Sequence, residues 1–102
     1  MAQHQGPDGW VPRAPTSIDF SNSQVGKKWG KHKTDFPELR NHIEYQNRAR
    51  DIFNQHDHRV FDPARNEFQY IRGNDLLRVS PSGTFISLYP GGRAIYIPYM
   101  GH

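Results

Sequence analysis

Lys27 to Phe36 is the segment of this chain whose residue types and spacing are best suited to chemistry. It places one histidine, His32, among four lysines, and no acidic residue appears before Asp35. Positive charge of this density attracts phosphate groups, and imidazole is the side chain whose unperturbed pKa lies nearest neutrality. One short segment could therefore hold an RNA backbone and move a proton on it, as a nuclease does. The alternative is a solvated basic loop with a surface histidine.

Two short motifs frame about residues 27 to 98. The first is Lys31-His32-x-x-Asp35-Phe36, and the second is Gly83-Thr84-Phe85-Ile86-Ser87-Leu88-Tyr89. Together they resemble the C-terminal tRNase domain of colicin D and the related toxin tips of contact-dependent growth-inhibition proteins, which are grouped with the barnase-like and RelE-like ribonucleases. The chain departs from that pattern at Pro37, where the family often has glycine, and at Trp29, where some relatives carry lysine.

The resemblance implies an antibacterial toxin that cuts tRNA, commonly at or near the anticodon loop, with His32 as a catalytic residue. It also implies a domain that is secreted or delivered from a cell surface and acts in the cytoplasm of the target cell. A cognate immunity protein would then be its partner, and we expect that protein to be acidic at the interface.

Length and composition are consistent with one small basic domain. The 102 residues carry a formal net charge of +3, which favours a polyanionic partner without requiring one, and 34% hydrophobic residues predict a thin core. Cysteine is absent, so disulfides and thiolate metal sites are excluded. No apolar run approaches a membrane span, and the N-terminus lacks the layout of a signal peptide.

The pattern along the chain predicts an α+β fold. Residues 1–22 are rich in glycine and proline and read as an irregular linker or strap, which leaves 23–102 as the ribonuclease domain. The spacing of Asp35 and Glu38 predicts one main helix from there to about Asn54, with His32 just before its N-terminus. Short segments between turn residues then predict about four strands in an antiparallel meander, as the resemblance to the barnase and RelE fold also implies. We expect these strands at 67–72, 76–80, 84–89 and 93–98.

Period-two alternation divides the strand residues between two faces. One set can point toward the helix and consists of Leu77, Val79, Ile86, Leu88, Ile95 and Ile97. The other set is polar and aromatic, and it consists of Arg78, Ser80, Phe85, Ser87, Tyr89 and Tyr96. We expect this second face to bind RNA through a guanidinium, hydroxyls and aromatic rings. The alternative is a solvated outer face with incidental aromatic residues.

The chemistry that fits these residues is metal-independent cleavage by the 2′-hydroxyl of the RNA, with no cofactor. The predicted catalytic residues are His32, Lys31, Ser87 and Tyr89, and the predicted substrate-binding residues are Lys28, Lys33, Arg78, Thr84 and Tyr96. The second proton-transfer group stays open between Tyr89, Lys31 and Lys28. We expect His56-Asp57-His58 to be a solvated loop more readily than a metal site.

Two hypotheses from other functional classes remain. A non-catalytic RNA-binding or ribosome-associated module could use the same basic segment and aromatic face, and would leave the RNA intact. A purely protein-binding domain would make the basic segment incidental.

Overall fold

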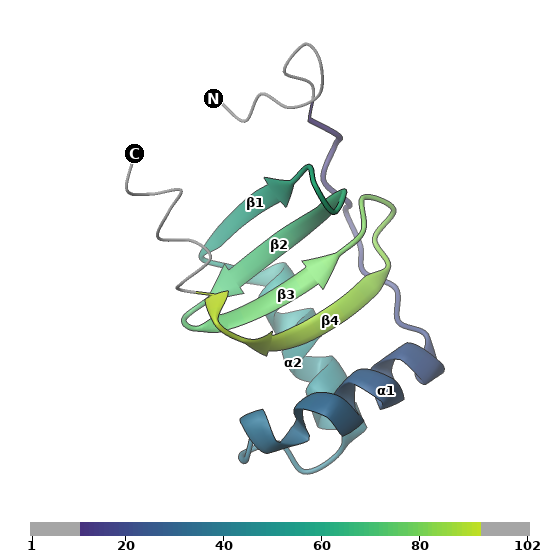
Figure 1. Cartoon of the computed structure of the whole chain (residues 1–102), viewed down its shortest axis with the longest axis vertical. Coiled ribbons are helices and arrows are strands. Elements are labelled where there is room, and N and C mark those ends of the chain that lie inside the picture. The colour runs from purple at the N-terminus through teal and green to yellow at the C-terminus, as the bar shows by residue number, and fades with distance from the viewer. Residues whose placement is uncertain (1–10, 93–102) are drawn as a thin grey trace.

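The fold is a four-stranded antiparallel sheet with one helix against a face and a second helix along an edge (Figure 1). The computed structural model describes residues 11–92. In chain order it contains α1 (Asn22–His32), the 3-10 turn η1 (Lys33–Asp35), α2 (His42–Asn54), β1 (His58–Asp62), β2 (Glu67–Arg72), β3 (Asp75–Val79) and β4 (Phe85–Pro90). Each strand pairs with the next, so the sheet order is β1-β2-β3-β4. The predicted α+β class and antiparallel meander are confirmed.

Three of the four predicted strands match β2, β3 and β4 to within one residue. The remaining strand of the sheet is β1, which the sequence analysis did not predict, whereas the segment 93–98 lies outside the described residues. β1 has only Val60 and Phe61 as an apolar signal, and Pro63 follows it directly. Its pairing with β2 along all five residues stabilises it as a strand.

The basic segment as far as His32 is the second half of α1, a helix that the sequence analysis did not predict. Ser21 caps α1 by accepting a hydrogen bond from the backbone N–H of Gln24 at 3.2 Å. Val25 and Trp29 then lie one turn apart on the side that packs against the core. Gly26 and Gly30 each disfavour a helix by about 1 kcal/mol relative to alanine. This weak helix propensity is the reason that the sequence analysis did not predict α1. Packing on β4 and α2 compensates for that weakness.

α2 begins later than predicted. Its N-cap is Asn41, whose side chain accepts a hydrogen bond from the N–H of Glu44 at 2.9 Å, and the Glu44 carboxylate accepts one from the N–H of Arg40 at 2.8 Å. The predicted capping residue Asp35 instead ends η1 and faces His32. His32 is therefore at the C-terminal end of α1, where the helix dipole does not attract an anion. The end of α2 at Asn54 agrees with the prediction.

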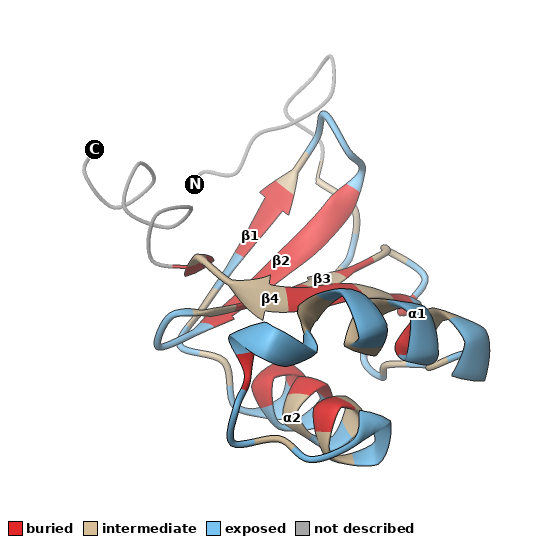
Figure 2. Cartoon of the chain, turned by 60° about the horizontal axis from the view of Figure 1, so that its bottom comes forward, coloured by how far each residue is buried: buried red, intermediate tan, exposed pale blue. Residues whose placement is uncertain are grey.

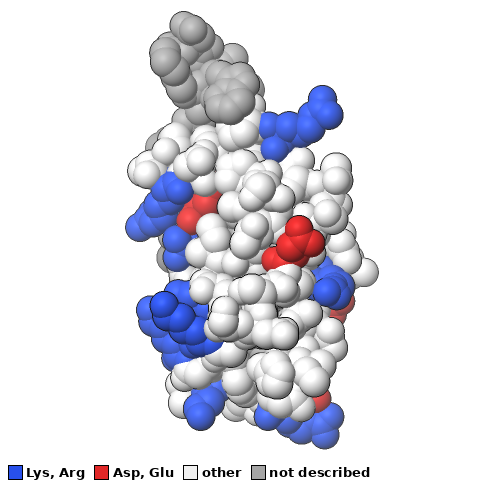
Figure 3. Space-filling view, turned by 90° about the vertical axis from the view of Figure 1, so that its right-hand side faces the viewer, with Lys and Arg blue, Asp and Glu red and all other residues white. Residues whose placement is uncertain are grey.

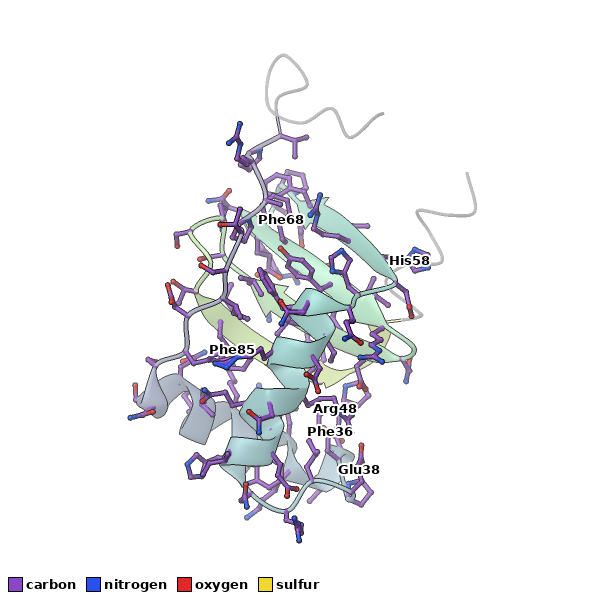
Figure 4. The ribbon with its side chains drawn as sticks, turned by 180° about the vertical axis from the view of Figure 1, so that it is seen from behind. Phe36, Glu38, Arg48, His58, Phe68 and Phe85 are labelled. Atoms are coloured by element: carbon purple, nitrogen blue, oxygen red, sulfur yellow. The ribbon has the colours of Figure 1, made fainter. Side chains whose placement is uncertain are left out.

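The core lies between α2 and the sheet, and in Figure 2 the inner side of α2 is buried while most of α1 is exposed. From behind, Phe68 and Phe85 are seen on the face of the sheet that α2 covers (Figure 4). The extended segment before α1 packs Ile18 and Phe20 against this core. The fully buried core side chains include Val25, Tyr45, Ala49, Ile52, Tyr70, Leu77, Val79, Phe85 and Leu88.

A β-bulge corrects the predicted face of Phe85. Leu77, Val79 and Leu88 face the helices as predicted, whereas Ile86 is half-buried and outside the core, and Ile95 and Ile97 lie outside the described residues. The register shifts between Arg78 and Val79, however, so that Val79 pairs with Phe85. This shift turns Phe85 into the core, where its ring centroid lies 6.2 Å from that of Tyr45. Simple alternation fails here because a bulge inserts one unpaired residue.

Candidate active site

The face of the sheet opposite α2 is mostly buried, which contradicts the prediction of an open binding face. Ile71 and Leu76 pair across β2 and β3, and each is at most 2% exposed. Glu67 and Ser87 on the same face are each 1% exposed. Arg78 on β3 and Tyr89 on β4 are only half-buried, so this face keeps an accessible part where those two side chains lie.

Helix α1 runs alongside β4 and brings His32 to this accessible part of the face. Near its start, the Gln24 amide donates a hydrogen bond to the carbonyl oxygen of Ile86 at 2.6 Å. At its end, the ring centroid of His32 lies 5.2 Å from that of Tyr89, with 31° between the planes. Eight helical residues rise about 12 Å and three strand residues about 10 Å, so helix and strand stay in step between the two contacts.

Asp35 orients the His32 ring. The Nδ1 atom of His32 lies 3.2 Å from the Oδ2 atom of Asp35, and the His32 side chain is 13% exposed. The tight turn of η1 makes this contact possible between residues three apart. When Nδ1 carries the proton that faces the carboxylate, Nε2 is left with a lone pair that can accept a proton.

Arg48 holds the segment that follows Asp35. Its guanidinium donates hydrogen bonds to Glu38 at 2.8 Å and to Asp75 at 3.0 Å, and it lies 5.8 Å from the centroid of the Phe36 ring. Figure 4 shows Arg48 on α2 beside Phe36 and Glu38. The segment that carries Asp35 is thereby tied to α2 and to the start of β3. The sequence analysis placed no structural role on Arg48.

Arg78 is held by a buried carboxylate that the sequence analysis missed. Its Nε and Nη2 atoms donate to the two oxygens of Glu67 at 2.5 and 2.8 Å, and Gln69 donates to the same carboxylate at 3.0 Å. The hydrogen bond to Glu67 is the main reason that the pKa of Arg78 lies above its ordinary value, and the nearby Tyr89 hydroxyl adds to it. The sequence signal that could have identified Glu67 was the period-two alternation of β2, because it puts Glu67 and Gln69 on one face of the sheet.

Lysines add positive charge next to His32. Lys28 lies one helical turn before His32 and is half-buried, whereas Lys31 and Lys33 are exposed. Burial is the main reason that the pKa of Lys28 lies below its ordinary value, and the charges of Lys31 and Arg78 lower it further. In the space-filling view, a group of basic side chains lies at the left margin, and further basic side chains lie at the top, the right and the bottom (Figure 3). The cations next to His32 suit an anionic ligand.

Three predicted site residues do not join this group. Ser87 is 1% exposed, and its hydroxyl, beside that of Tyr45, has no hydrogen-bond partner of normal geometry in the described part of the chain. It cannot contact a substrate from there, so its predicted catalytic position is wrong. Thr84 lies at the opposite end of β4 from Tyr89, where it pairs with Asp19. Tyr96 lies outside the described residues.

The comparisons with known proteins found no relative of this chain. No protein-family model matches the chain, and no curated protein matches it either. Within residues 11–92, no helix has the length and apolar character needed to cross a membrane. Over the same range, no three or more histidine, aspartate or glutamate side chains are grouped so as to hold a metal ion.

Proposed function

We propose that the chain is an endoribonuclease that cleaves RNA through the RNA's own 2′-hydroxyl. The observation that carries this proposal is the convergence of His32 and Tyr89, from α1 and β4, next to the cations Lys28 and Arg78. His32 and Tyr89 are far apart in the sequence, and they come together because α1 lies alongside β4. A proton-transfer group beside fixed positive charge is what phosphodiester cleavage needs.

In this proposal His32 is the general base. Its Nε2 atom takes the proton of the 2′-hydroxyl while the 2′-oxygen forms a bond to phosphorus. The bond between phosphorus and the 5′-oxygen then breaks, and that oxygen receives a proton from Tyr89 or Lys28. The products are a 2′,3′-cyclic phosphate and a free 5′-hydroxyl. The Asp35 carboxylate supports this role because it fixes the ring and stabilises the imidazolium that forms.

In this proposal Arg78 and the lysines stabilise the negative charge of the pentavalent phosphate. Glu67 accepts from Nε and Nη2 of Arg78, which leaves the two N–H groups of Nη1 and the second N–H of Nη2 to bind the Tyr89 hydroxyl or a phosphate. Lys31 is exposed near the site and can approach the RNA backbone. The lowered pKa of Lys28 makes its ammonium group a better proton donor than an ordinary lysine.

The resemblance in the motifs around His32 and Tyr89 supports tRNA as the substrate. It also supports an antibacterial toxin that acts in the cytoplasm of a target cell, with an immunity protein as its partner. These parts of the proposal rest on the motifs and not on the geometry of the site.

The test is incubation of the purified chain with total bacterial tRNA in EDTA, followed by a denaturing gel and analysis of the new ends. We expect discrete fragments with cyclic phosphate ends, and a His32→Ala variant slower by about 10²- to 10⁴-fold. His42→Ala is the matched control, because His42 is exposed at the start of α2. Binding of tRNA without cleavage would replace the proposal by the RNA-binding module. Full activity in His32→Ala would refute the assigned base.

A further inference from the structure

The two edge strands of the sheet, β4 and β1, differ in how their outer backbone groups are paired. On β4, the backbone of Asp19 bonds to Gly83 at 2.7 Å and to Phe85 at 2.9 Å, and Gln24 bonds to Ile86 at 2.6 Å. The hydroxyl of Tyr45 occupies the next position along this edge. No further strand can pair there. At the other edge, β1 has no outer partner strand among the described residues, and Figure 1 shows no other described element beyond it. An open strand edge is a template for another strand.

The hydrogen bonds of Tyr45 show which backbone groups of β1 face outward. Tyr45 donates to the carbonyl of Leu88 and accepts from its N–H, so both groups of Leu88 point away from β3. Leu88 pairs with Leu77, and Leu77 pairs with Tyr70. In an antiparallel sheet, hydrogen-bonded and non-hydrogen-bonded pairs alternate from one strand to the next. Leu77 and Tyr70 are therefore a hydrogen-bonded pair.

The same alternation reaches β1 through Tyr70, which pairs with Arg59. Because Tyr70 bonds toward β3, the N–H and C=O of Arg59 face outward from the sheet. Those of Phe61, two residues on, also face outward, whereas those of Val60 bond to β2. β1 therefore offers two donors and two acceptors at its outer edge.

We propose that two copies of this chain associate through β1, as an antiparallel pair with its two-fold axis at Val60. Arg59 of each copy then lies opposite Phe61 of the other copy, and their outward N–H and C=O groups form four hydrogen bonds. Val60 lies opposite Val60 of the other copy, and His58 lies opposite Asp62. Such an interface uses the same surface twice and closes on itself.

The side chains select this register. A pair centred on Arg59 would place two guanidinium groups opposite each other, which is unfavourable. A pair centred on Phe61 would place Arg59 opposite Pro63, which has no N–H to donate. The Arg59 guanidinium lies 5.8 Å from the centroid of the Phe68 ring. In the register centred on Val60, the Arg59 side chain also lies next to Phe61 of the other copy, and a cation beside an aromatic ring is favourable.

The size of the contact sets its strength. Two five-residue strands make a small interface, so the association is reversible and depends on protein concentration. β1 and β4 are opposite edges of the sheet, so the dimer leaves the His32 site open in both copies. The proposal is thus independent of the ribonuclease activity.

Sedimentation of the full chain from about 20 µM to about 1 mM tests the association. We expect the average mass to rise from that of one chain toward that of two. Arg59→Pro removes the outward N–H and should keep the mass at one chain, since proline is tolerated where the N–H faces out from an edge strand. Arg59→Ala is the matched control, because it keeps that N–H and should still associate.

Amide hydrogen exchange tests the register, and it does not depend on whether the proline variant folds. The amides of Arg59 and Phe61 should exchange several-fold more slowly at high concentration, while that of Val60 should not change. A single-chain mass throughout would overturn the proposal, as would association without protection of these two amides. Protection of both amides in a single-chain particle would mean that this chain covers its own edge, and it would overturn the proposal too.

Discussion

Replacing Tyr45 by phenylalanine tests the contact that ties α2 to the edge of β4. Tyr45 and Leu88 are both fully buried, and the Tyr45 hydroxyl donates to the Leu88 carbonyl at 2.5 Å and accepts from the Leu88 N–H at 3.2 Å. Tyr45→Phe keeps the ring in the core but leaves two buried backbone groups without a partner. Each such group costs about 1–3 kcal/mol, so we expect a loss of about 2–6 kcal/mol of unfolding free energy for the two.

Tyr70→Phe is the matched control for that substitution. Tyr70 is 1% exposed, and its hydroxyl has no hydrogen-bond partner of normal geometry among residues 11–92. The same chemical change there removes no such bond, so we expect a loss of under about 1 kcal/mol. For a domain of this size each kcal/mol lowers Tm by roughly 4–8 °C, so thermal unfolding followed by circular dichroism separates the two variants clearly. Equal shifts, or a larger one in Tyr70→Phe, would refute the role given to the Tyr45 hydroxyl.

Three further predictions concern the site and its support. Asp35→Asn should lower the cleavage rate, because His32 loses the carboxylate that holds its ring in place; an unchanged rate would contradict the role given to the contact at 3.2 Å. Tyr89→Ala should reduce tRNA cleavage at equal folded fraction, whereas Ser87→Ala should not, since Ser87 is buried; a larger loss in Ser87→Ala than in Tyr89→Ala would contradict the role given to Tyr89. Burial raises the pKa of Tyr45, so the native state keeps a proton that the unfolded chain releases above about pH 10. Unfolding free energy, measured by urea titration, should therefore fall as pH rises beyond that value, and Tyr45→Phe should flatten the fall.

Local sequence signals were enough to predict much of the sheet. Turn residues bracket β2, β3 and β4, and alternation within them identified Leu77, Val79 and Leu88 as core. These features could be read from the chain because a strand between tight turns depends mainly on its own residues and its nearest neighbours. The end of α2 could be read for the same reason. α1 could not, because its glycines weaken the local signal and its stability comes from β4 and α2.

For the candidate site, the sequence by itself determined the residue types and the tertiary structure decided which of them meet. His32, Tyr89 and Arg78 were predicted from motif and alternation, and the fold brings them to one border of the sheet. Only the tertiary structure decided that Ser87 is buried and that Glu67 occupies two donors of Arg78. The physical reason is that burial and ion pairing depend on residues distant in sequence, whose positions follow from the strand register and from the path of α1 along β4.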